Sequence, residues 1–282
     1  MLLLESVPNF SEGREAATIE AIGEAIGSRA RLLDVHADPD HNRSVFTLVG
    51  ADGELVEALL AGVEAARARI DLRDHAGVHP RIGAADVVPI VPIDPGDLDR
   101  ARGVALALGA RIGALGLPVF VYAPPERGPA FYRRGGTAEL QRRLDAGELA
   151  PDFGPALLVP AAGGVIVGAR PALVALNVDL AGPLAAAREI AAAVREVGGG
   201  FRGVRALGLE LSSAGLVQVS MNIEDWQESP PAEVVARIRA EAAARGLAVA
   251  GVELVGLIPA GAAAGLEGIE PSRILESRLA GP

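Results

Sequence analysis

Branched and aromatic side chains gather in short runs along the first half of the chain, separated by longer stretches in which apolar residues recur every three or four positions. Runs at residues 2–10, 85–93 and 118–123 predict strands, and runs at 31–38 and 43–50 flank a PDHN turn and predict a β-hairpin. Its prolines should place 85–93 at a sheet edge or strand end. Helical spacing covers residues 11–28, with Ser11 as the cap, 53–70 and 94–116.

The second half repeats this architecture on a smaller scale. We interpret residues 124–155, which are rich in Pro, Gly and Arg, as a connecting excursion. The pattern predicts an α/β (α+β) fold of two subdomains, 1–177 and 178–282, each a mixed β-sheet with helices on its outer face. The other faces would be free to meet around a ligand. Expected strands cover 164–180, 204–211, 215–223 and 250–259, and expected helices cover 183–198 and 230–246.

Two amino acids are missing, and their absence excludes several kinds of chemistry. The sequence has no lysine and no cysteine, which excludes Schiff-base catalysis, the phosphate-loop lysine, thiol nucleophiles, iron–sulfur clusters and cysteine zinc sites. A net charge of -10 argues against a nucleic-acid surface, which needs clustered positive charge. No secretory or membrane-spanning segment is visible, so we expect a cytoplasmic protein without nucleic-acid or membrane partners.

All four histidines lie in two clusters, His36 and His41 in HADPDHNRS, and His75 and His79 in DHAGVHPR. Histidine titrates near neutral pH, which favours this region for acid–base chemistry. A metal site is an alternative, but a glycine and a proline argue for a loop, not for the helix that would put His75 and His79 on one face, and we expect no metal. Alone, His36, His41 or His75 is readily explained as a polar loop residue bonded to backbone. His79 differs because it lies beside a proline and an arginine able to bind anions.

Seven ordered blocks of the sequence resemble one family. The blocks are ESVPNFSEGR, LLDVHADPDHNRSVFTLVG, HAGVHPRIGAADVVPIVP, APDFGP, GARPALVALNVDL, QVSMNIEDW and VELVGLIP. Together they look like the formiminotransferase domain of glutamate formimidoyltransferases, which is fused to a cyclodeaminase in animals and occurs alone in some bacteria. The resemblance covers nearly the whole chain and keeps the order of the blocks.

This resemblance implies a reaction, a catalytic residue and a folate site. The family transfers a formimino group from N-formimino-L-glutamate to N5 of tetrahydrofolate and releases L-glutamate, a step of histidine degradation and one-carbon metabolism. Its catalytic histidine falls on His79, tetrahydrofolate is the co-substrate, and its two sheets face each other across a ligand tunnel. Its folate-binding stretch falls on Gly154, Pro155, Ala156, Leu157, Leu158, Val159, Pro160, Ala161, Ala162 and Gly163.

Arginines should meet the carboxylates of both substrates. N-formimino-L-glutamate has two carboxylates and folate has a glutamyl tail, and by their motif positions Arg43, Arg81 and Arg170 are candidates. For each of them a structural salt bridge is the alternative. Glycines and small residues in the folate stretch would let a flat pterin approach the backbone, and a turn joining two subdomains would explain them equally well.

Three further residues are candidates for substrate binding. Asn42 is one of only four asparagines in the sequence, and in a composition so short of this amino acid a replaceable amide would tend to have been replaced. Animal members of the family carry an aspartate where this chain has His36. We therefore expect Asp38 to replace that acid and His36 to contact substrate.

Other functions remain open. The fold could belong to a folate-binding protein without transfer activity, or could act on formylglutamate or 5-formyltetrahydrofolate, because amidine and formyl groups are nearly isosteric. A metal-dependent hydrolase acting through the histidine clusters is a third possibility. We expect a homodimer that uses small-molecule substrates, with the cyclodeaminase, if present, as a separate protein.

Overall fold

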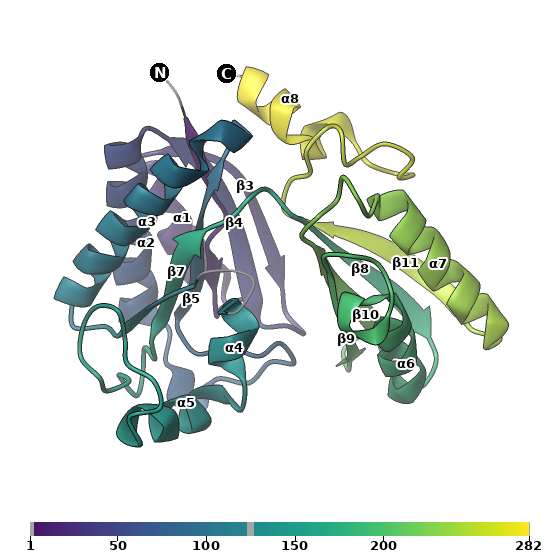
Figure 1. Cartoon of the computed structure of the whole chain (residues 1–282), viewed down its shortest axis with the longest axis horizontal. Coiled ribbons are helices and arrows are strands. Elements are labelled where there is room, and N and C mark those ends of the chain that lie inside the picture. Colours follow the sequence, from purple (N-terminus) through teal and green to yellow (C-terminus); the bar gives the residue numbers. More distant parts are fainter. Residues whose placement is uncertain (1–2, 123–126, 282) are drawn as a thin grey trace. The chain divides into compact units, whose positions relative to one another are not determined.

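The computed structural model describes residues 3–122 and 127–281 (Figure 1). Leu2, the first residue of one expected strand, and Ala123, the last residue of another, lie outside the described residues. The same holds for residues 124–126 at the start of the expected connection. None of the helices formed by the described residues combines the length and the apolar character of a membrane span.

The chain divides into two compact units, Met1–Pro171 and Ala172–Pro282. Each unit has its own sheet, its own helices and its own apolar core, so the expected α/β fold with two subdomains is confirmed. The boundary expected after residue 177 falls inside strand β8 (Val174–Ala181) of the second unit.

The first unit is built on a mixed seven-stranded sheet. Its strands are β1 (Leu4–Ser6), β2 (Asn9–Phe10), β3 (Arg31–Asp38), β4 (Arg43–Gly50), β5 (Ala85–Pro92), β6 (Val119–Val121) and β7 (Val165–Ala169). β3 pairs with β4, both β1 and β2 lie between β4 and β5, and β7 and β6 follow. β5, β7 and β6 are parallel, whereas the pairs on the β3 side are antiparallel.

Helices cover the two faces of this sheet unequally. The long helices α1 (Ala16–Gly27), α2 (Asp52–Arg69) and α3 (Leu98–Ala114) lie together on one face (Figure 1), over the larger apolar core. The shorter α4 (Pro129–Arg133) and α5 (Gly136–Asp145) bury a second, smaller core.

The alternation of side chains shows that these two cores lie on opposite faces. On β7, Val165 and Val167 belong to the larger core, whereas Ile166 between them packs with Tyr132 and Leu140 of α4 and α5. The α4–α5 face continues across the sheet to β3 and β4, where His36, Asp38 and Arg43 lie on the same face as the apolar Val45.

The start of the first helix differs from the expectation. The helix begins at Ala16, and Ser11 does not cap it, because the Ser11 hydroxyl donates to the Gly83 carbonyl at 2.7 Å. Ser11 therefore ties the chain after β2 to the segment that leads into β5.

The prolines of β5 are accommodated in two ways. Pro92 ends the strand, as expected, whereas Pro89 lies within it, and β5 is an internal strand of the sheet and not an edge. Pro89 removes one N–H from the ladder, and its carbonyl accepts a hydrogen bond from the Ser6 hydroxyl at 2.6 Å.

The second unit follows the expected β-α-β-β-α-β order. Its elements are β8, α6 (Leu184–Val194), β9 (Val204–Leu211), β10 (Leu216–Ile223), α7 (Pro231–Ala244), β11 (Ala248–Val255) and α8 (Leu275–Ala280). The strand order is β11-β8-β10-β9, and every pair is antiparallel, so this sheet is not the mixed sheet that we expected. A hairpin joins β9 to β10, whereas α6 connects the parallel strands β8 and β9, and α7 connects the parallel strands β10 and β11, each crossing over one antiparallel strand.

One face of this second sheet is apolar, and the other carries polar side chains on β8, β10 and β11. Val178 and Val219 are fully buried in the core beneath α6 and α7. Their neighbours on the opposite face are polar: Gln218 donates from Nε2 to Asp179 Oδ1 at 2.9 Å, and Asn177 donates from Nδ2 to Glu253 Oε2 at 2.9 Å.

Candidate active site

Three loops of the first unit meet beside the polar end of the β3–β4 hairpin: residues 11–14, the turn 39–42 and the loop 75–81. Asn42 links all three, since its Oδ1 accepts from the Gly13 N–H at 2.9 Å and its Nδ2 donates to the Ala76 carbonyl at 3.1 Å. Its φ of 45° is left-handed, a conformation that asparagine tolerates better than most residues. The buried Asn42 side chain therefore holds the loops together.

Arg81 fastens two of these loops from within. Its Nη1 donates to the Asn42 carbonyl at 2.7 Å, and its Nη2 donates to the carbonyls of His41 at 2.6 Å and His79 at 2.9 Å. Nη1 also lies 3.1 and 3.0 Å from the ring nitrogens of His75. Burial lowers the pKa of Arg81 to about 10. These contacts indicate a structural role for Arg81, because protein carbonyls already accept the hydrogen bonds of its guanidinium.

The close approach of the loops leaves no room for a side chain at Gly77. A Cβ atom there would lie 2.4 Å from the His41 carbonyl oxygen. Gly77 thus allows the loop 75–81 to lie directly against the hairpin turn.

Burial, and next the charge of Arg81, lowers the pKa of His75.

His79 lies in the part of the loop that faces the hairpin. Its ring meets the His41 ring edge-on, with centroids 6.0 Å apart and planes at 89°. Burial lowers the pKa of His79 well below its ordinary value of 6.5, and the charges of Arg43 and Arg133 lower it further. At neutral pH His79 is therefore a neutral imidazole, able to accept a proton.

Asp38 and His41 form a pair within the hairpin turn. The Nδ1 atom of His41 lies 2.6 Å from Asp38 Oδ2, and the His41 backbone N–H donates to Asp38 Oδ1 at 2.9 Å. Burial acts to raise the pKa of Asp38, but the hydrogen bonds from His41 outweigh it and the pKa is lowered. The Nε2 atom of His41 is buried and has no hydrogen-bond partner among the described residues.

Arg43 opens β4 and lies opposite Asp38 in the hairpin ladder. Its Nε atom is buried, and no atom of residues 3–122 or 127–281 accepts a hydrogen bond from it. Burial, and next the charge of Arg133, lowers the pKa of Arg43 to about 9. A buried guanidinium with an unused donor is unfavourable unless an anion completes it, so Arg43 is well suited to bind a carboxylate.

A second, largely buried arginine, Arg133, comes from α4. Arg133 pairs through Nη2 with Asp86 Oδ2, while Asp86 Oδ1 accepts from the Ile82 N–H at 2.7 Å. A bulge explains the position of Asp86: Val87 pairs with Asn9, and the residue before Asp86 pairs with the next residue of β2, so Asp86 is the extra residue of the bulge. Within the described part of the chain, the buried Nε atom of Arg133 also lacks a partner.

The expected folate stretch, residues 154–163, lies against both ends of the His79 loop. The Ala161 carbonyl accepts from the Leu72 N–H at 2.8 Å, and the Ala162 carbonyl accepts from the Ala84 N–H at 2.9 Å. Gly163 has a φ of 68°, and a Cβ there would lie 1.9 Å from the Ile82 carbonyl oxygen. Glycine at 163 is therefore required by backbone packing, whatever else it contacts.

Two expected substrate residues lie outside this cluster or at its margin. His36 is half-buried on β3, on the same face as Asp38 and two residues from it. The Arg170 backbone N–H donates to the Ile90 carbonyl at 3.1 Å, near the far end of β5 from the His79 loop. At about 3.3 Å per residue, Ile90 lies roughly 16 Å along that strand from Ala85, its end nearer the His79 loop. The structure thus does not bring Arg170 to His79.

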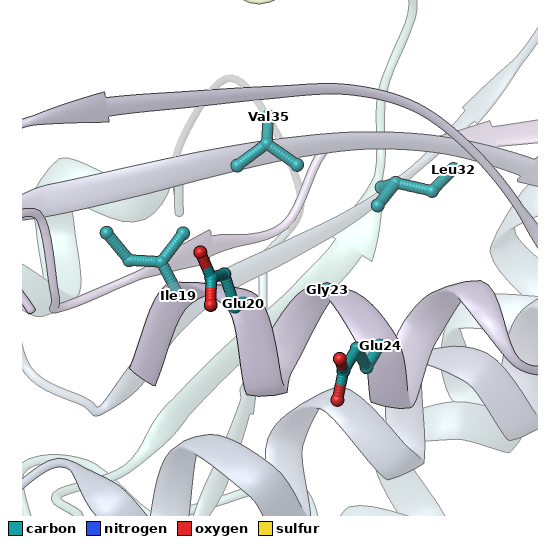
Figure 2. A pocket seen from close by; sticks show the side chains of 6 residues that line it. All are labelled: Ile19, Glu20, Gly23, Glu24, Leu32 and Val35. Atoms are coloured by element: carbon teal, nitrogen blue, oxygen red, sulfur yellow. The ribbon is translucent and has the colours of Figure 1, made fainter. Parts of the chain in front are cut away.

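A shallow groove of about 440 Å³ lies elsewhere on the first unit, between α1 and β3. Figure 2 shows its apolar floor and the two glutamates of α1 at its side. Val35 in this groove and His36 next to it point to opposite faces of the sheet, so the groove is separate from the charged cluster. Its lining residues are Ile19, Glu20, Gly23, Glu24, Leu32 and Val35. Among the described residues, no group of three or more His, Cys, Asp or Glu side chains is placed to hold a metal ion.

Two family models match the chain in sequence order. The model of the formiminotransferase domain, N-terminal subdomain, matches residues 3–170, and the model of the formiminotransferase domain matches residues 175–265. The chain belongs to the formiminotransferase family. The junction between the two matches falls close to the division between the two compact units.

Curated relatives of this formiminotransferase include both stand-alone and fused proteins. A glutamate formimidoyltransferase of Thermoplasma acidophilum is 37% identical over 297 residues, covering 99% of this chain and 98% of the relative. A glutamate formimidoyltransferase of Streptococcus pyogenes is 37% identical, covering 92% of this chain and 89% of the relative. The formimidoyltransferase-cyclodeaminase of Rattus norvegicus is 38% identical, and this chain spans about half of it, 50%.

The sequence did not point to three residues of the candidate active site. Arg133 lies in the stretch interpreted as a connection, where its FYRRGG context was the available signal. Asp86 is the one charged residue in an otherwise apolar strand run, a pattern that marks a buried carboxylate with a need for a partner. His41 by itself is explained as a loop residue, and its spacing of three from Asp38 is the signal that would have paired the two.

Proposed function

We propose that this chain transfers the formimino group of N-formimino-L-glutamate to N5 of tetrahydrofolate and releases L-glutamate. The arrangement that carries the proposal is His79 next to Arg43 and Arg133, which lower its pKa and each keep a buried Nε–H donor unused by the described residues. Curated relatives over nearly the whole length carry the name glutamate formimidoyltransferase. An acid–base group beside an anion site is what this reaction needs.

The guanidiniums account for substrate binding. N-formimino-L-glutamate has two carboxylates, and the buried Nε–H groups of Arg43 and Arg133 are donors that the described part of the protein leaves unsatisfied. Arg81 has a different role, because its donors already hold the carbonyls of the two loops. We propose that Arg43 and Arg133 bind carboxylate and that Arg81 and Asn42 position the loops.

His79 accounts for the proton movements. In the overall exchange, a new bond forms between N5 and the formimino carbon, the bond from that carbon to the glutamate nitrogen breaks, N5 loses one proton and the glutamate nitrogen gains one. His79 accepts the first proton as a neutral base and returns it to the leaving nitrogen as imidazolium. The lowered pKa makes the imidazolium a strong acid, which favours the second transfer.

Substrate binding should also adjust this base. Carboxylates that neutralise Arg43 and Arg133 would remove part of the charge that lowers the pKa of His79, so the pKa should rise when the donor is bound. A base whose pKa approaches neutrality in the complex works efficiently in both directions.

The turn at residues 159–163 supports a folate site next to His79. It is hydrogen-bonded to residues on both sides of the His79 loop, so a pterin lying along this stretch would be within reach of the imidazole. We propose this stretch as the folate contact, with residues 154–157 as its exposed part.

The test is the formation of 5-formiminotetrahydrofolate by the purified chain, with and without each substrate, in the presence of a chelator. Transfer from N-formimino-L-glutamate that persists with the chelator is expected. Binding of tetrahydrofolate without transfer would contradict the proposal and favour a folate-binding protein. Loss of transfer with the chelator, restored by a metal, would favour the hydrolase-type chemistry.

The assembly state stays a prediction of the sequence. We propose a homodimer, which sedimentation at micromolar concentration would report as twice the 28.8 kDa chain mass. A monomeric mass under these conditions would contradict it.

A further inference from the structure

One ring nitrogen of His41, next to His79, is left without a partner by the contact with Asp38. Its Nδ1 lies 2.6 Å from a carboxylate oxygen of Asp38, and an ionised carboxylate can only accept hydrogen bonds. In the neutral ring Nδ1 therefore carries the proton, and Nε2 is left with a lone pair. Asp38 is itself held in place, because its other oxygen accepts the His41 backbone N–H at 2.9 Å.

The lone pair of His41 Nε2 has no donor in the described part of the protein. The atom is buried, the residue is 5% exposed, and the ring stands edge-on to His79 at 6.0 Å. A proton on Nε2 would place an unpaired N–H donor in a region that already holds the cations Arg43, Arg81 and Arg133, which is unfavourable. Next to the proposed acid–base residue, the protein thus offers an acceptor that a ligand donor can complete.

The two donor molecules that the sequence leaves open differ at this point. A formimino group carries an N–H where a formyl group carries a carbonyl oxygen. The first can donate to a lone pair, whereas the second would place two acceptors against each other. Sites that hydrogen-bond a substrate N–H reject analogues that lack it, because the buried polar group is then left unsatisfied.

We infer that His41, with its tautomer fixed by Asp38, accepts a hydrogen bond from the formimino N–H and thereby selects formimino over formyl donors. This inference rests on the proposed function, because it assumes that the donor's reacting carbon lies beside His79. It assigns no proton transfer to His41.

The geometry of the pair provides a sharp test in Asp38→Asn. In this variant the His41 backbone N–H should hold the amide oxygen in the place of Asp38 Oδ1, which puts the amide nitrogen against Nδ1. That nitrogen donates, so the imidazole proton must move to Nε2, and the acceptor becomes a donor. Nitrogen NMR shifts of the ring report the tautomer directly.

The measured quantity is the ratio of kcat/KM for N-formimino-L-glutamate to kcat/KM for N-formyl-L-glutamate. His41→Leu, which removes the acceptor, should lower this ratio by about 10-fold to 100-fold, and Asp38→Asn should lower it at least as much. Asp74→Asn, the same change on an exposed carboxylate of the neighbouring loop, should leave it unchanged. If formyl transfer is too slow to measure, the inhibition constant of N-formyl-L-glutamate replaces it.

The outcomes separate this inference from the proposed function. If the wild-type chain does not transfer from N-formimino-L-glutamate, the proposed function fails. If it does, but folded His41→Leu keeps the wild-type ratio, or His41 carries a proton on Nε2 in the wild-type chain at neutral pH, the inference is overturned. Either variant alone decides the ratio if the other does not fold.

Discussion

On the polar face of the second sheet the amides of Gln218 and Asn177 have carboxylate partners on neighbouring strands, whereas on the polar face of the first sheet buried guanidiniums keep unused donors. Gln218 and Asn177 donate to Asp179 and Glu253 at 2.9 Å, and the Oε1 atom of Gln218 is left as a buried acceptor within the described chain. Arg43, in contrast, keeps a buried Nε–H that no described residue accepts.

The guanidiniums of the first face and Gln218 of the second differ in the kind of hydrogen-bond partner that they lack. Buried polar groups of a folded chain are normally satisfied, so unsatisfied ones mark places where a ligand completes the structure. The guanidiniums of the first face need an acceptor, which suits carboxylates, whereas Gln218 on the second face needs a donor. Each sheet has a well-packed apolar core on its other face, so the contrast does not arise from a difference in folding.

The largest effect should follow from removing the base on the first face. His79→Ala should lower kcat by about 100-fold to 10,000-fold, the usual contribution of a positioned acid–base group, while both substrates still bind. His75→Ala should lower kcat less, because His75 contacts Arg81 and is not among the residues that we propose to bind substrate or to move protons. Turnover and dissociation constants of both variants check this. Near-normal turnover in His79→Ala would contradict the mechanism, and loss of folate binding alone would make His79 a binding residue.

Arg43→Met should separate function from stability. We expect KM for N-formimino-L-glutamate to rise by about 10-fold to 100-fold, as for loss of a charged hydrogen bond. The free energy of unfolding should stay the same or rise by about 1 kcal/mol, because a buried, partly unsatisfied charge has been removed. Arg102→Met on the exposed side of α3 is the control and should change neither quantity. Strong destabilisation by Arg43→Met would show that the guanidinium has a structural partner.

Gln218→Leu should give the reverse result on the second face. It takes the Gln218 donor away from the Asp179 carboxylate, which should lower the free energy of unfolding by about 1 to 3 kcal/mol. KM for N-formimino-L-glutamate should stay unchanged. Urea unfolding and steady-state kinetics on the same preparation check both. A KM that rises as much as in Arg43→Met would remove the contrast between the two faces.

The apolar faces of both sheets could be predicted from the sequence, and the polar faces only in part. Period-two and period-four patterns locate strands such as Val174–Ala181 and helices such as Leu98–Ala114 because burial selects the same residue types in any protein. The antiparallel order of the second sheet follows from how strands return, which no local pattern records.

Some residues of the candidate active site could be predicted from the sequence, and others could not. His79 and Arg43 lie in blocks that resemble a family, so they could be named without a structure. The pairing of Asp86 with Arg133 joins positions 47 residues apart through a bulge, and no spacing predicts it. Nor can a sequence tell that Arg81 and Asn42 use their hydrogen bonds on loop carbonyls and amides, since the same residue types bind substrates elsewhere.

The smallest effect that we expect is a shift in the pKa of His79. NMR can follow this shift because the sequence has four histidines, all in the first unit. The His79 ring should titrate well below pH 6.5, and Arg43→Met should raise its pKa towards that value because one cation is removed. His75 is the internal control, since its pKa is lowered by burial and by Arg81. Added L-glutamate should also raise the pKa of His79 in the wild-type chain, through its carboxylates.

The lowered pKa of His79 also predicts how the free energy of unfolding changes with pH. A histidine whose pKa is lowered on folding binds fewer protons than in the unfolded chain, so its contribution is present above pH 6.5 and is lost as the pH falls towards the folded pKa. Urea midpoints should therefore decrease from pH 7 to about pH 5, and less steeply in Arg43→Met than in Arg102→Met. A His79 ring that titrates at or above pH 6.5, or that ignores Arg43→Met, would mean that the guanidiniums do not act on the base, and the charged face would then be only a binding surface.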